Sequence, residues 1–284
     1  MSDNLKRNFK SQGELVAYLK AQFPDAAERS DAISAIPGGR QAAETALHKV
    51  DPERYAKSRN FFTGAVTRLS PYIRYGVLSL AEIRQYVMNR VQNPDEATKI
   101  VNELAWRDYW QRLYAKLGDD IWQDNEPYKT GYSAQDYAQI LPEDIKLGTT
   151  ERVCIDSFSR DLQETGYLHN HGRMWLAAYM IHWRKIRWQV GAKWFLEHLL
   201  DGDPASNNMS WQWVASTFSQ KPYYFNRENL ERYTEGVYCR QCPLYGHCDF
   251  EGSYEELAEK LFPKAEFHRN GGGDRYQKSK KSRR

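Results

Sequence analysis

The sequence predicts an all-α protein, because helix signals recur along the chain and strand patterns do not. Apolar residues recur at helical spacing after clear start signals, and glycines follow where several of these series end. No segment shows the convincing alternation of apolar and polar residues that indicates a half-buried strand. With 284 residues and 41% hydrophobic content, the chain has ample material for a folded core.

The expected helices are located by their start and stop signals. Ser79 and Glu82 have capping-box spacing before an apolar series, and Pro94 opens a long helix over residues 96–117 that Gly118 ends. The other expected helices cover residues 14–23, 156–165 (with Gly166 as the C-cap), 170–188, 192–200, a segment that begins at Pro204, and a short segment after the capping pair Ser253 and Glu256. Residues 123–150 and 220–252 are predicted to be loops.

The chain is expected to divide into a helical lead-in (residues 1–36), a main helical domain (37–263) and a basic tail (264–284). The tail carries eight Lys/Arg and two Asp/Glu, so we expect it to be disordered and either to attract phosphates or simply to aid solubility. No apolar run approaches the ~20 residues that cross a bilayer. We therefore expect a cytoplasmic protein without a membrane partner. Separately, we expect a monomer.

Residues 201–213 concentrate polar and aromatic groups beyond what helix packing needs. Asp203 is placed to cap the helix that Pro204 begins, and Asn207 and Trp211 are four residues apart, on one helical face. Asp201 and Trp213 add a second carboxylate and a second indole. A planar, hydrogen-bonding, redox-active ligand would account for this set.

A second candidate wall lies in the long helix expected over residues 96–117. Glu103, Trp106, Arg107 and Trp110 fall at i, i+3, i+4 and i+7, on one face. This pattern is compatible with a surface Glu103–Arg107 pair beside two core tryptophans. Taken alone, the pattern favours this packing interpretation. The alternative is a ligand wall in which Trp106 stacks on a flat base and Glu103 hydrogen-bonds the edge of that base.

Four motifs together resemble the flavin-binding domain of the photolyase/cryptochrome family. They are residues 66–72 (VTRLSPY), residues 102–107 (NELAWR), residues 166–174 (GYLHNHGRM) and residues 201–213. Their order and spacing are similar to those of the family, and the resemblance covers roughly residues 37–226. It implies a photolyase-type all-helical domain folded around FAD.

The resemblance also implies roles for individual residues. The residues expected to bind FAD are Tyr55, Thr67, Arg68, Leu69, Ser70, Arg107, Asn170, Arg173, Asp201, Asp203 and Asn207, the last facing flavin N5. The residues expected to contact a cyclobutane pyrimidine dimer are Glu103, Trp106, Asn170, Met174 and Trp213. Trp211 and Trp188 match the first two members of the family's tryptophan electron relay, and no tryptophan near Gln135 matches the third.

The implied activity is that of a deoxyribodipyrimidine photolyase, a carbon–carbon lyase that acts on DNA containing pyrimidine dimers. Excited reduced FAD passes an electron to the flipped-out dimer, the cyclobutane ring opens, and the electron returns. Only 36 residues precede the matched region, so we expect no N-terminal α/β antenna domain, no antenna chromophore in this chain, and a preference for single-stranded DNA. The alternative is a cryptochrome-like blue-light photoreceptor without repair activity.

Four cysteines lie beside and beyond these motifs. Cys239, Cys242 and Cys248 are close in sequence, the first two with chelating C-x2-C spacing, and Cys154 starts an earlier helix. Four thiolates suit zinc or a [4Fe–4S] cluster. Reduced structural thiols or a disulfide explain the same cysteines, and the sequence leaves these alternatives open.

Overall fold

The structure is a computed structural model that describes residues 5–29 and 33–265 in two compact units, Met1–Ile36 and Pro37–Arg284. The first unit holds α1 (Gln12–Gln22) and α2 (Pro24–Arg29). The Ser11 side chain caps α1 by accepting a hydrogen bond from the Glu14 backbone N–H. Most of the basic tail falls outside the described residues.

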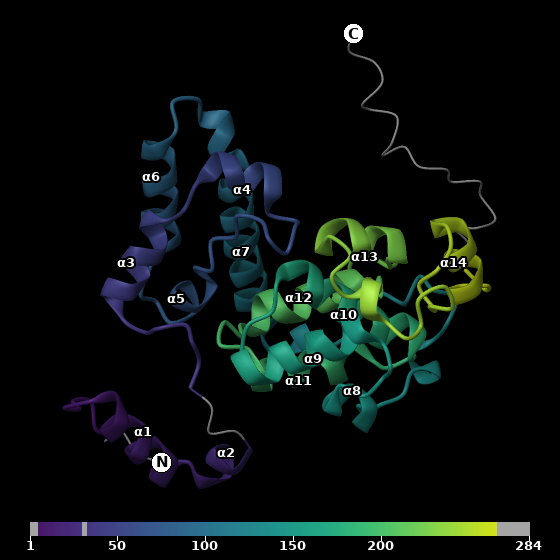
Figure 1. Ribbon diagram of the computed structural model, residues 1–284, viewed down its shortest axis with the longest axis horizontal. Helices are drawn as coiled ribbons and strands as arrows, with labels where there is room; N and C mark the ends of the chain where they lie inside the picture. The colour runs from purple at the N-terminus through teal and green to yellow at the C-terminus, as the bar shows by residue number, and fades with distance from the viewer. Residues whose placement is uncertain (1–4, 30–32, 266–284) are drawn as a thin grey trace. The chain divides into compact units, whose positions relative to one another are not determined.

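The regular secondary structure in the described part of the second unit is helical (Figure 1). Its α-helices are α3 (Arg40–His48), α4 (Pro52–Ser58), α5 (Ser70–Arg74), α6 (Leu80–Arg90), α7 (Thr98–Leu117), α8 (Glu143–Leu147), α9 (Val153–Thr165), α10 (Asn170–Ala178), α11 (Trp188–His198), α12 (Pro204–Ala215), α13 (Arg227–Thr234) and α14 (Tyr254–Leu261). Within residues 5–29 and 33–265, the β-type pairing is limited to one isolated bridge, between Ala138 and Ile186. The all-α prediction is confirmed.

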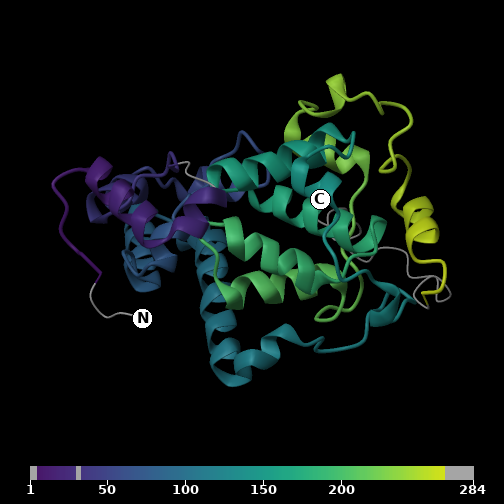
Figure 2. The same ribbon diagram turned by 90° about the horizontal axis from the view of Figure 1, so that it is seen from below.

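The main core lies among α9, α10, α11 and α12, which pack side by side (Figure 2). Its largest fully buried side chains include Trp175, Trp188, Tyr179, Phe158 and Phe195. The long helix α7 packs against α12 on one side and against α4 and α6 on the other. It therefore joins the core helices to the smaller helices at the other end of the unit.

Local capping signals predicted several helix ends correctly. Ser79 and Ser253 both form complete capping boxes, at the starts of α6 and α14. The Asp203 side chain accepts the Ser206 backbone N–H at 2.9 Å and so caps α12. Gly118 and Gly166 end α7 and α9 with φ of 56° and 66°, which L-residues rarely adopt.

Two expectations about elements were wrong. The helix expected over residues 170–188 ends in a π-helical turn, Tyr179–Trp183, and Lys185 then takes a left-handed φ of 50°. Trp188 consequently begins α11 instead of ending the preceding helix. The expected loops also contain helices, α8 and α13, which are five and eight residues long and too short for a strong periodic signal.

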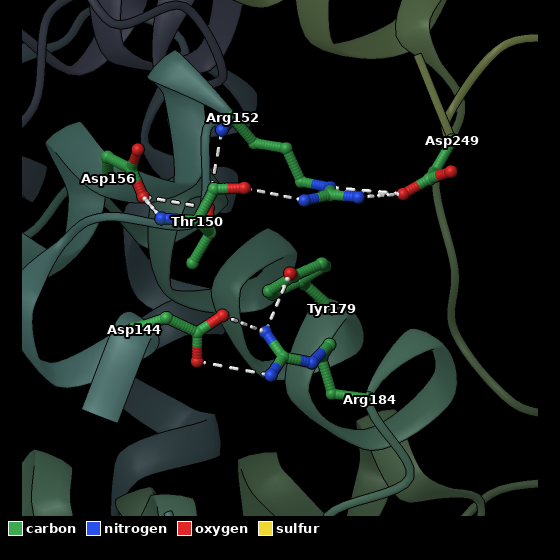
Figure 3. Close-up of polar contacts among 7 residues, drawn as sticks. All are labelled: Asp144, Thr150, Arg152, Asp156, Tyr179, Arg184 and Asp249. Carbon is green, nitrogen blue, oxygen red and sulfur yellow. Dashed lines mark hydrogen bonds and ion pairs between the residues drawn. The ribbon is translucent and has the colours of Figure 1, made fainter. Parts of the chain in front are cut away.

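Two arginines tie the segments around α8 and the C-terminal region to the core (Figure 3). Arg184 donates to both carboxylate oxygens of Asp144, at 2.7 and 3.1 Å, and to the Tyr179 hydroxyl at 3.1 Å. Arg152 contacts the Thr150 carbonyl and the Asp249 carboxylate. Such bidentate, partly buried pairs fix geometry better than single surface pairs do.

Candidate functional site

A cavity of about 350 Å³ opens between α7, α10 and α12 and the segment that leads into α5. Its volume is within the ~300–1,000 Å³ range of small-molecule and cofactor sites. Of the residues predicted from sequence, those that line it are Tyr55, Thr67, Arg68, Leu69, Ser70, Glu103, Trp106, Arg107, Asn170, Arg173, Met174, Asp201, Asp203, Asn207 and Trp211. Segments separated by more than 100 residues of sequence thus meet at one site.

Two buried carboxylates form the polar floor of the cavity. Asp201 accepts a hydrogen bond from Arg173 Nη2 at 2.9 Å, while its other oxygen, Oδ1, is buried without a hydrogen-bond partner. Asp203 accepts two hydrogen bonds from Gln111 Nε2, at 2.9 and 2.8 Å, besides capping α12. Asp201 Oδ1 is therefore a buried acceptor available to a ligand.

Electrostatics keep both carboxylates ionised. Burial alone would raise the pKa of Asp201, but the charge and hydrogen bond of Arg173 outweigh burial, and the net shift lowers it. Burial alone would also raise the pKa of Asp203, but hydrogen bonds from Ser206 and Gln111 bring that pKa below its usual value. The cavity floor is therefore anionic at neutral pH.

Arginines supply the opposite charge. Arg107 lines the cavity half-buried and forms no hydrogen bond or ion pair with the described residues. Burial lowers its pKa, while the nearby charges of Asp203 and Asp201 act against that shift. Arg68 and Arg173 both lie over the Tyr167 ring, 5.3 and 5.5 Å from its centroid. The cavity can thus hold anionic groups beside hydrogen-bond donors.

Asn207 presents an oriented amide to the cavity. Its Nδ2 donates to the Ala192 carbonyl at 3.0 Å and to Asn208 Oδ1 at 3.1 Å. Because a carbonyl oxygen can only accept, these bonds fix which end of the amide is nitrogen. The Asn207 carbonyl oxygen is left as the acceptor that a ligand N–H could use.

The mouth of the cavity combines an ion pair with exposed rings. Glu103 pairs with Arg59 at 2.9 Å, so the Glu103–Arg107 surface pair is not formed. Trp106 is 54% exposed and stacks on Trp110, with ring centroids 5.2 Å apart. Trp106 is therefore not a core residue, and the ligand-wall interpretation of this helix face stays a prediction.

Some residues singled out in the sequence lie away from the cavity. Trp213 is 41% exposed and packs on Tyr223, outside the cavity lining, and Trp188 is fully buried in the core. The basic residues Arg184, Lys185, Arg187 and Lys221 also lie outside the cavity lining. Arg184 is instead held by Asp144, and Lys185 donates to the Leu261 carbonyl at 3.1 Å.

The four cysteines line one small cavity of about 10 Å³, and none is in a disulfide. Burial, with the neighbouring thiols, raises the pKa of Cys154 well above its usual value and that of Cys239 to about 12. Within residues 5–29 and 33–265, no three or more His, Cys, Asp or Glu side chains are grouped so that they could hold a metal ion. The metal prediction therefore stays a prediction.

Sequence reasoning missed three polar residues of the site. Arg59, which follows α4, reaches Glu103, and Gln111 reaches Asp203 from α7. Tyr167 lies between two arginines. Gln111 shares a helix face with Arg107, four residues earlier, and this spacing is the one signal that could have identified it. The other two depend on contacts between distant segments.

His169 helps to place Arg59 and makes stability depend on pH. Its Nδ1 accepts the His171 backbone N–H at 3.1 Å, so Nε2 carries the proton and donates to the Arg59 carbonyl at 3.1 Å. Burial lowers the pKa of His169 to about 4; burial and then the nearby His169 lower that of His171 to about 4. Both side chains are therefore neutral in the folded protein near pH 7.

We expect the melting temperature to fall as the pH is lowered from ~6.5 to ~4. Between these pH values the two histidines bind protons in the unfolded chain but stay neutral in the folded protein. The free energy of unfolding therefore falls, by at most roughly 3 kcal/mol per histidine. Below ~4 these two groups cause no further loss. Thermal unfolding followed by circular dichroism measures the effect. His171→Asn should flatten the profile and exposed His247→Asn should not; equal profiles in all three proteins would contradict the assignment.

No described helix has both the length and the apolar character that membrane crossing requires.

The chain is similar to photolyases and cryptochromes. Residues 100–240 match the FAD binding domain of DNA photolyase. A deoxyribodipyrimidine photo-lyase of Streptomyces griseus is 34% identical over 54% of this chain and 32% of that protein. A cryptochrome DASH (chloroplastic/mitochondrial) of Solanum lycopersicum is 34% identical over 57% of this chain and 29% of that protein.

The fold is also that of solved relatives. The crystal structure of a Synechocystis sp. PCC6803 cryptochrome superimposes with a TM-score of 0.62 at 27% identity, over 74% of this chain and 46% of that one. This chain spans about a third of the length of the two curated relatives. Through residues 100–240, the chain belongs to the photolyase/cryptochrome family of FAD-binding domains.

Proposed function

We propose that the protein uses light to reverse cyclobutane pyrimidine dimers in DNA, with FAD as its cofactor. The observation that carries the proposal is that one cavity is lined both by Asp201, Asp203 and Asn207 and by Glu103 and Trp106. The first group suits a flavin, and the second suits a flat base with hydrogen-bonding edges. A site that served only to hold the cofactor would not need the second group at its mouth.

The cavity residues fit FAD in charge and in hydrogen bonding. The unpaired Asp201 Oδ1 and the Asn207 carbonyl oxygen are acceptors for N–H or O–H donors of the cofactor. Arg107, which has no partner among the described residues, and Arg68 offer positive charge to its phosphates. When bound and reduced, FAD supplies the light absorption and the electron that open the dimer.

The chain's own residues hold the substrate. Trp106 offers an exposed ring face on which a flipped-out pyrimidine stacks. Glu103, oriented by Arg59, hydrogen-bonds the polar edge of the pyrimidine, while Arg59 supplies positive charge beside the carbonyl where negative charge develops. Asn170 and Met174, one helical turn apart on α10, complete the wall.

The exposed rings at the mouth support a preference for single-stranded DNA. Trp106 is 54% and Tyr109 46% exposed, and their ring centroids are 5.9 Å apart. Bases stack on such rings once they are unpaired. We expect faster light-dependent loss of dimers from a single-stranded oligonucleotide than from the same strand in a duplex, measured by chromatography of the digested DNA. Equal rates on both substrates would remove this preference from the proposal.

A blue-light photoreceptor without repair activity is the alternative, since cryptochromes are among the relatives. The repair measurement separates the two functions. A photoreceptor would bind FAD and respond to light, yet leave every dimer intact. Loss of dimers that requires both light and protein supports the lyase.

A further inference from the structure

The long helix α7 carries an exposed aromatic surface beside the cavity. Of its 20 residues only Ile100 is buried, although the helix contains two tryptophans and two tyrosines. Trp106 is 54% exposed and Tyr109 is 46% exposed. Contiguous exposed apolar groups of this kind mark interaction sites.

The two exposed rings form separate platforms. Trp106 and Tyr109 have ring centroids 5.9 Å apart and planes at 76° to each other. Trp110 supports both, since its ring stacks on Trp106 at 5.2 Å and lies 5.0 Å from that of Tyr109. One flat base cannot stack on two rings that are nearly perpendicular. Each ring therefore offers a face to a different base.

Only one of the two platforms belongs to the cavity. Trp106 and Trp110 line the cavity, whereas Tyr109 lies outside its lining. A dimer that enters the cavity meets Trp106 and leaves the Tyr109 ring free. Because the strand continues beyond the dimer on both sides, a nucleotide next to the dimer can reach Tyr109.

Lysines lie on the same face of α7 at both ends of the rings. Lys99, Trp106, Tyr109 and Lys116 fall at i, i+7, i+10 and i+17, which places them on one side of the helix. Both lysines are exposed and form no ion pair with the described residues. Free lysines suit the phosphates of a nucleic acid and are depleted from the cores of protein–protein interfaces. This face therefore fits a nucleic acid strand better than a protein partner.

We propose that Tyr109 is the stacking platform for the unpaired base next to the pyrimidine dimer in single-stranded DNA. The inference rests on the proposed function for the position of the dimer. Tyr109 makes and breaks no bond, so it is a specificity-determining residue and not a catalytic one. It favours single strands because a neighbouring base that is paired in a duplex is not free to stack on the ring.

Binding in the dark tests the proposal without a repair step. The FAD-loaded protein is titrated with a dimer dinucleotide and with trinucleotides that add a normal or an abasic nucleotide on the 5′ or the 3′ side. On one of these sides, we expect the added base to lower Kd at least roughly fivefold relative to the abasic nucleotide. Tyr109→Leu should remove this advantage and Tyr109→Phe should keep it. Both variants should bind the bare dinucleotide as wild type does.

Tyr75→Leu is the matched control, because Tyr75 is 71% exposed and lies outside the cavity lining. It should bind every ligand as wild type does. An undamaged single strand separates this proposal from the proposed function, since Tyr109→Leu should weaken its binding by a similar factor whether or not the protein repairs dimers.

Three results would overturn the proposal. The first is wild-type protein that binds the base-bearing and abasic trinucleotides equally on both sides. The second is an equal loss of the advantage in Tyr75→Leu. The third is weaker binding of the bare dinucleotide by Tyr109→Leu, which would place the dimer itself on this ring.

Discussion

Asp201→Ala is expected to purify with little or no flavin. The Asp201 side chain is 4% exposed and forms the ion pair that neutralises Arg173 at 2.9 Å. Its removal leaves the Arg173 charge in a partly buried site, and breaking such a pair costs roughly 3–5 kcal/mol. If most of this cost appears in cofactor binding, the dissociation constant rises by about a hundredfold or more. Flavin content and equilibrium titration with FAD measure the change.

Two further variants make the Asp201 prediction specific. Asp201→Asn keeps the shape but not the charge, and should also lose most of its flavin. Glu164→Ala removes an exposed carboxylate from α9 and should leave flavin content unchanged. Circular dichroism separates loss of cofactor from loss of fold. Wild-type flavin affinity in both Asp201 variants would show that FAD binding does not depend on the Asp201 carboxylate.

Glu103→Ala is expected to retain flavin and lose most repair. The carboxylate lies at the mouth of the cavity, paired with Arg59, and not on the floor where the cofactor is expected. A hydrogen bond to a charged group contributes about 1.5–3 kcal/mol, so we expect repair to slow by roughly ten- to hundredfold. The measurement is the rate of dimer loss under saturating light, with binding to dimer-containing DNA measured in the dark.

The matched control lies on the same helix. Asp108 forms an exposed pair with Arg112 at 2.7 Å, four residues apart on α7. Asp108→Ala should repair at the wild-type rate, because such surface pairs contribute little and this one lies outside the cavity lining. If Glu103→Ala and Asp108→Ala repaired equally well, the assignment of the substrate side to Glu103 would be wrong.

The parts of the fold and site that depend on local geometry could be predicted from the sequence. The start of α12 was predictable because Asp203 caps it and Pro204 has the right φ for the first helical position. Asn207 and Trp211 are four residues apart on this helix, so they were expected to share a face, and both line the cavity. The same rule places Trp213, two residues beyond Trp211, on a different face, and it lies outside the lining.

The parts that depend on contacts between distant segments could not be predicted. Arg59 and Glu103 are 44 residues apart and Gln111 and Asp203 are 92 apart, so no sequence window contains either pair. The break after Trp183 gave no signal either, because neither glycine nor proline marks it. The π-helical turn and the left-handed Lys185 depend on tertiary packing, which sequence periodicity does not report.

One measurement tests the central claim most directly. A single-stranded oligonucleotide containing a defined cyclobutane dimer is mixed with the protein carrying chemically reduced FAD, and dimer content is followed in paired light and dark samples. Our account predicts that dimers disappear in the light, stay intact in the dark, and disappear roughly ten- to hundredfold more slowly in the light when Glu103→Ala replaces the wild-type protein. Intact dimers in the illuminated wild-type sample, with FAD bound and reduced, would contradict it.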